Sequence, residues 1–149
     1  MRRTLILGLL LPVSLIVLAH AQPDPQTVLW TGIKKQLSGP EGERYFEANL
    51  KDTALPPLRG TLVSALLNEG VSRLVLKMPG SEEPDVTLIV HKGSAKLAAN
   101  PAPGRSITFS GTGAAFSATP FMLTFDVDIG NLQGIAFARL GSKNGPRSE

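Results

Sequence analysis

The sequence predicts a mainly β domain, built as a small five-stranded barrel that follows two short helices. Three observations lead to this prediction. Apolar residues recur every three to four positions between residues 28 and 50, which is the helical period. From Arg59 to Asp128 the period changes to two, in five short runs separated by Gly, Pro and polar residues. An open sheet of five short strands leaves two exposed edges, and closure into a barrel removes them.

The N-terminus has the pattern of a secretory signal peptide. Arg2 and Arg3 precede an apolar run over residues 5–18, and the small residues of "AHA" end at Ala21. The run is shorter than the ~20 residues of a membrane span. We therefore expect export to the periplasm or beyond, with cleavage after Ala21 and no transmembrane segment in the mature chain.

Charge and cysteine content exclude several classes of protein. Arg2 and Arg3 supply two of the three net positive charges, so the mature chain has almost no surplus to attract phosphate groups. The chain contains no cysteine, which excludes disulfide bridges and fits a bacterial envelope better than a eukaryotic secreted module.

Two helices are expected after the signal, within an N-terminal segment over residues 22–57. "TVLWTGIKKQLSG" places Leu29, Ile33 and Leu37 on one face, and Gly39 ends the helix. "PEGERYFEANLKD" begins with Pro40 in its first turn and contains an apolar i,i+4 pair. "LPPL" then forces an extended connection into the barrel.

The β segment is expected over residues 58–138, with a flexible tail at 139–149. Its strands are "GTLVSALL", "VSRLVLKM", "DVTLIVH", "RSITFSGTG" and "FMLTFDVDI". "SAKLAA" is expected to form at most one helical turn, and "AAFSATP" a turn or bulge. Three meandering strands, a connector and a final hairpin favour an OB-like barrel. The alternative is an open five-stranded sheet backed by the helices.

Four stretches carry a resemblance: "LRGTLVSALL", "DVTLIVH", "PAPGRSITFSGTGAAF" and "PFMLTFDVD". Over Leu58 to Asn131 the chain resembles small exported bacterial OB-fold domains, and it is similar to uncharacterised secreted proteins of Acidobacteria-like bacteria. Gly60 and Val63 match a G-x-x-V first strand, and "PGRSITFSG" matches the fourth-strand pattern one residue short. The resemblance implies a fold and transfers no catalytic motif.

Asp126 and Asp128 are the candidates for chemistry. "DVDIG" resembles part of a calcium loop, but the third oxygen ligand is missing and Phe137 stands at the distal position. Strand alternation gives a simpler interpretation, with both aspartates on the solvent face. His91 is the single histidine of the mature chain, so a zinc site would need carboxylates, and no serine stands in a G-x-S-x-G elbow.

Arg73, Lys77 and His91 form a modest basic strip that could carry a ligand, and Trp30 could contribute to a partner surface. An OB-like barrel suggests binding of single-stranded nucleic acid, because such barrels stack bases on aromatic side chains. The second and third predicted strands, however, contain no aromatic residue. Docking of the helices onto the barrel is the simpler role for Trp30.

The sequence therefore predicts a non-enzymatic exported module of the bacterial envelope, with a binding or structural role and no cofactor. Its expected partner is a protein or another envelope ligand. The alternatives are a weak metal-binding or hydrolytic protein using Asp126, Asp128 and His91, and a domain that binds single-stranded nucleic acid.

Overall fold

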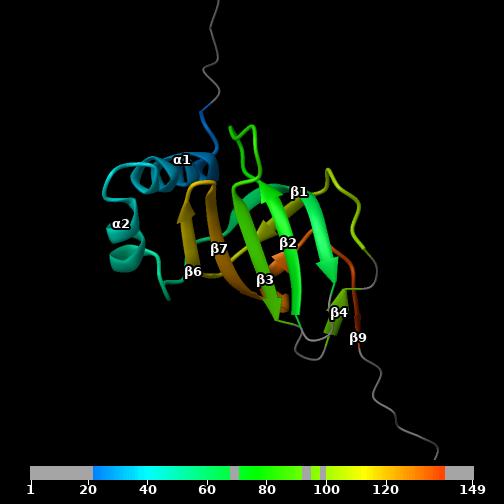
Figure 1. Ribbon diagram of the computed structural model, residues 1–149. Helices are drawn as coiled ribbons and strands as arrows, with labels where there is room; N and C mark the ends of the chain where they lie inside the picture. Colours follow the sequence, from blue (N-terminus) through cyan, green and yellow to red (C-terminus); the bar gives the residue numbers. More distant parts are fainter. Residues whose placement is uncertain (1–21, 68–70, 92–94, 98–99, 140–149) are drawn as a thin grey trace, which may run out of the picture.

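The computed structural model describes residues 22–67, 71–91, 95–97 and 100–139. The predicted signal peptide and residues 140–149 of the predicted tail lie outside this part of the chain. Figure 1 shows two helices at one side of a curved sheet and a short two-stranded ribbon at the opposite side. Within the described residues, no helix is long and apolar enough to cross a bilayer.

The main sheet has seven strands in the order β6-β7-β3-β2-β1-β5-β8, and β4 pairs with β9 in the separate ribbon. Neighbouring strands are antiparallel except β3 and β7, which are parallel. The strands are β1 (Leu58–Leu67), β2 (Val71–Lys77), β3 (Val86–His91), β4 (Ala95–Leu97), β5 (Ser106–Phe109), β6 (Thr112–Ala118), β7 (Phe121–Asp128), β8 (Leu132–Gln133) and β9 (Phe137–Arg139).

The mainly β architecture behind two short helices is confirmed, but the predicted closed barrel of five strands is wrong. The sheet does not close, because β5 pairs with β1 on one side and β8 on the other, while β6 pairs with β7. At the junction between β5 and β6, the Ser110 N–H donates to the Asn131 carbonyl (3.0 Å) and Gly111 accepts from the Leu55 N–H (3.0 Å). The two residues between β5 and β6 therefore bond to the segments around Asn131 and Leu55.

Of two local predictions, the first is right about an irregularity and a turn but misses the strand between them, and the second is wrong. "AAFSATP", expected to be a turn or bulge, belongs mostly to strand β6, whose register with β7 shifts between Gly113 and Ala115. "SAKLAA", expected to hold a helical turn, contains strand β4. Both segments are rich in alanine, which has little preference for strands, so pairing with a partner strand decides their conformation.

Helix α2 (Gly42–Asn49) falls inside its predicted segment, whereas helix α1 (Pro25–Leu37) begins two residues before the segment predicted for it. Pro40, expected in the first turn of α2, lies in the turn that joins the two helices. Asp24 caps α1 by accepting from the Gln26 N–H at 3.5 Å, and Pro25 occupies the first turn, where its missing N–H costs nothing. The buried face of α1 carries Trp30, Ile33 and Leu37, in agreement with the predicted apolar stripe except that Leu29 is only half-buried.

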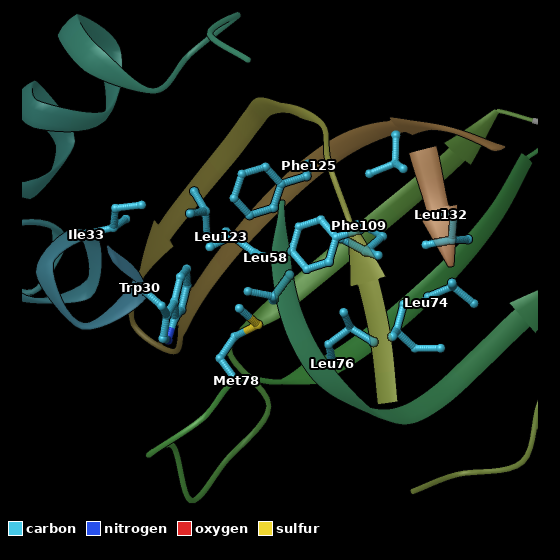
Figure 2. Close-up of a cluster of buried hydrophobic side chains, with 14 of the residues drawn as sticks. Trp30, Ile33, Leu58, Leu74, Leu76, Met78, Phe109, Leu123, Phe125 and Leu132 are labelled. Carbon is cyan, nitrogen blue, oxygen red and sulfur yellow. The ribbon is translucent and has the colours of Figure 1, made fainter. Parts of the chain in front are cut away.

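The core lies between the helices and the inner face of the curved sheet (Figure 2). The predicted alternation holds on β2, β5 and β7, where every second side chain is buried. Phe109 of β5 and Phe125 of β7 stand with ring centroids 5.4 Å apart, although three strands separate β5 from β7 in the sheet. The sheet must therefore curl strongly for its distant strands to share one core.

A buried carboxylate fixes α1 to the loop between β2 and β3. Asp85 is only 2 % exposed and accepts from the Met78 N–H (2.9 Å), the Ser81 hydroxyl and the Lys34 ammonium (2.9 Å). The Lys34 ammonium also lies 5.2 Å from the centre of the Phe121 ring. The carboxylate is thus hydrogen-bonded and paired, as burial of a charge requires.

Candidate functional site

The parallel pairing of β3 and β7 brings the sequence-predicted residues together. Ile89 lies opposite Asp126 and His91 opposite Asp128, with these four side chains on the face away from the core. His91 Nε2 is 3.3 Å from Asp126 Oδ1. Both side chains remain about half exposed, so their pairing is an accessible surface contact.

A pocket of about 210 Å³ opens beside this pair. The junction between β5 and β6 forms one wall, and the turn after β7 forms another. A Cβ added to Gly111 would lie 2.4 Å from the Asp126 carbonyl oxygen, so the absence of a side chain lets the junction approach β7. The lining residues are Ala54, His91, Ser110, Gly111, Thr112, Asp126, Val127, Asp128 and Asn131.

Sequence reasoning missed Ser110, Thr112 and Asn131. The stretch "SGTG" contained a signal for the first two, because glycines inside a strand pattern often mark a close approach of two backbones. Nothing in the sequence places Asn131 beside these residues, since its position depends on the turn that follows β7.

The pocket has an acidic character. Its lining contains the carboxylates of Asp126 and Asp128, one imidazole, and no lysine or arginine. The Ser110 hydroxyl already donates to the Leu55 carbonyl at 2.9 Å. Thr112 and Asn131 add hydroxyl and amide groups, so the lining combines negative charge with neutral hydrogen-bonding groups.

Among the described residues, neither a metal centre nor a Ser-His-Asp arrangement is assembled. Within the described ranges, no group of three His, Cys, Asp or Glu side chains could hold a metal ion. His91 Nε2 faces Asp126, and in the same part of the chain no hydroxyl is hydrogen-bonded to the imidazole. A Ser-His-Asp arrangement would need such a hydroxyl as its nucleophile.

The three residues of the predicted basic strip share the outer face of β2 and β3 but do not line one pocket. Arg73 and Lys77 are exposed on the outer face of β2, where Val71 is the residue paired with His91. Lys77 instead borders a separate cavity of about 300 Å³ that Arg59 also lines. The strands β1, β2 and β3 carry no Phe, Tyr or Trp on either face, so this surface lacks the rings that stack on nucleic acid bases.

Trp30 lies in the core instead of on the surface. It is 1 % exposed and meets the Phe121 ring edge-to-face, with ring centroids 6.4 Å apart. This position matches the expectation that Trp30 docks the helix onto the sheet.

A scan against protein-family models found no match for this chain. A search of curated proteins found no significant similarity either.

Proposed function

We propose that this protein is a non-enzymatic exported binding module, and that its pocket beside His91, Asp126 and Asp128 holds a small, positively charged polar group. The observation that carries the proposal is the composition of the pocket wall. Two carboxylates and an imidazole converge there, without a lysine or arginine in the lining to neutralise them.

A cationic group complements this wall. An ammonium or guanidinium group donates charge-assisted hydrogen bonds to carboxylates, and these are roughly twice as strong as bonds between neutral groups. The Thr112 hydroxyl and the Asn131 amide stand in the same lining and can accept further donors. The partly open walls suit the charged end of a molecule whose remainder stays in solvent.

The predicted signal peptide supports a role for this binding in the envelope or outside the cell. An open, mainly β sheet preceded by two short helices does not by itself indicate a function. Such folds carry unrelated functions, so the proposal depends on the pocket and not on the fold.

Isothermal titration calorimetry of the mature chain with the diamine putrescine tests the proposal. We expect saturable binding that weakens about fivefold or more in Asp126→Asn and in Asp128→Asn, and that weakens as salt is added. Glu82→Gln removes an equal charge from an exposed loop and should bind as the parent does. Parallel titrations with calcium and zinc test the metal alternative: saturable heat with either ion, lost in Asp126→Asn and absent with putrescine, would overturn the proposal.

A further inference from the structure

The free edge of the main sheet carries a second candidate site, independent of the pocket proposed above. Strand β6 is the last strand on this side of the sheet, and helix α2 lies next to it (Figure 1). The segment 51–54 covers only the beginning of this edge, through bridges to Thr112 and Gly113. The second half of β6 lies beyond that segment.

The hydrogen bonds of β7 show which backbone groups of β6 point outward. The Leu123 N–H donates to the Asp85 carbonyl at 3.0 Å, on the β3 side, so Met122 and Thr124 must face β6. Their partners in the register are Ser117 and Ala115. By alternation, the N–H and C=O groups of Phe116 and Ala118 point away from β7. In the described part of the chain, no backbone group bonds to them on that side.

These outward groups face open space. A cavity of about 330 Å³ is lined on the β6 side by Phe116 and Ala118, the two residues identified above, and on the helical side by the α1–α2 turn. A second cavity of about 220 Å³ continues along Ala114, Ala115 and Phe116. Both cavities are bordered by Glu43 and Phe116, so together they form a groove between β6 and α2.

The groove has an acidic wall and an apolar floor. Phe116 is half-buried, and its ring centroid lies 6.0 Å from that of the buried Phe46. Glu47 is neutralised by Lys51 at 2.8 Å, and this hydrogen-bonded contact raises the pKa of Lys51. Glu43 lines both cavities and has no ion-pair partner among the described residues.

We infer that this groove receives an extended, basic peptide segment of another protein, which adds as a strand to the edge of β6. Unpaired strand N–H and C=O groups bind extended backbone, as in other cases of strand addition. The peptide side chains that face the groove would need an apolar stem that packs against Phe116 and a positive end that lies near Glu43. Lysine and arginine have both features.

NMR titration of the ¹⁵N-labelled mature chain tests this inference. The probe is a seven-residue peptide, acetylated and amidated, in which lysine alternates with valine. Its matched control carries N-methyl groups on the backbone nitrogens of alternate residues, on the edge that would meet β6, so that charge and side chains are kept while the strand donors are lost. We expect shifts centred on residues 114–118 and binding at least about tenfold weaker for the N-methylated peptide, because several edge hydrogen bonds are removed.

Glu43→Gln should weaken binding of the lysine peptide about threefold, as expected for one partly exposed ion pair. Glu41→Gln is the matched control, because Glu41 is exposed, pairs with Arg44 and does not line either cavity. Equal affinity for both peptides, or shifts that avoid β6, would overturn the inference. So would concentration-dependent shifts at β6 in the free protein together with a dimer in analytical ultracentrifugation, because the occupant would then be a second copy. None of these outcomes bears on putrescine binding at the His91 pocket, so the two proposals can fail separately.

Discussion

At the residue scale, Asp85 is a buried carboxylate that depends on its hydrogen-bond and ion-pair partners. Removing its carboxylate in Asp85→Ala would leave the buried Met78 N–H without an acceptor and the Lys34 ammonium without its partner. We expect a loss of about 2–4 kcal/mol in the free energy of unfolding, measured by urea denaturation. Asp85→Asn keeps an acceptor for Met78 and should lose less. A change below about 0.5 kcal/mol in Asp85→Ala would contradict this role.

Gly113 provides a second test at this scale. A Cβ at this position would lie 2.3 Å from the Leu50 carbonyl oxygen, so Gly113→Ala must push the segment after α2 away from β6. We expect a destabilisation of about 1–3 kcal/mol. Gly130→Ala is the matched control, since a Cβ there meets nothing within 4 Å. Equal melting temperatures for the two variants would show that the contact does not constrain the fold.

The candidate site shows what residue types alone can predict. Asp126, Asp128 and His91 were the candidate side chains for metal binding or catalysis. Strand alternation correctly predicted that the two aspartates lie away from the core. Their meeting depends on the parallel pairing of β3 with β7, strands separated by 29 residues of chain that include β5 and β6. Pairing between distant segments leaves no mark in local periodicity, so the His91–Asp126 contact could not be predicted.

At the scale of elements, strong periodicity was a reliable guide. The helices α1 and α2 and the strands β1, β2, β3, β5 and β7 all follow runs with a clear period and a buried face. Strand β6 was missed because "TGAAFSA" contains small residues and a glycine, which favour strands poorly. Strands β4, β8 and β9 span only two or three residues each, too few for alternation to be recognised.

The docking of α1 is testable as the property of a whole element. Ile33 is buried on the face of α1 that meets the sheet, and Trp30, the single tryptophan of the chain, lies on the same face. Ile33→Ala should cost about 2–4 kcal/mol and shift the midpoint of the unfolding transition followed by Trp30 fluorescence. Val28→Ala changes an exposed position of the same helix and should leave that midpoint unchanged. An unchanged midpoint in Ile33→Ala would contradict the docking.

At the scale of the whole molecule, the sequence predicts a chain processed on export. When the full chain is expressed in a bacterial host with an intact secretion pathway, we expect the exported product to begin at Gln22. Intact-mass spectrometry of the periplasmic fraction measures this directly. A product that retains Arg2 and Arg3, or one found only in the cytoplasm, would contradict the expected export.

The open sheet gives the molecule two separate surfaces. The pocket lies where the junction from β5 to β6 approaches β7, and the groove lies along the opposite edge of β6, beside α2. A closed barrel, as predicted from the strand count, would have left no free edge for a peptide. Because the two proposed sites lie on separate surfaces, variants of one site should leave binding at the other unchanged.

We have proposed that the pocket beside His91, Asp126 and Asp128 binds a cationic group. The most direct test is a ¹H–¹⁵N NMR titration of the mature chain with putrescine. We expect saturable shifts confined to residues around 110–112, 126–128 and 131, with an affinity that is about fivefold or more weaker in Asp126→Asn and unchanged in Glu82→Gln. Saturable shifts elsewhere on the molecule, or an Asp126→Asn variant that binds as well as the parent, would contradict it.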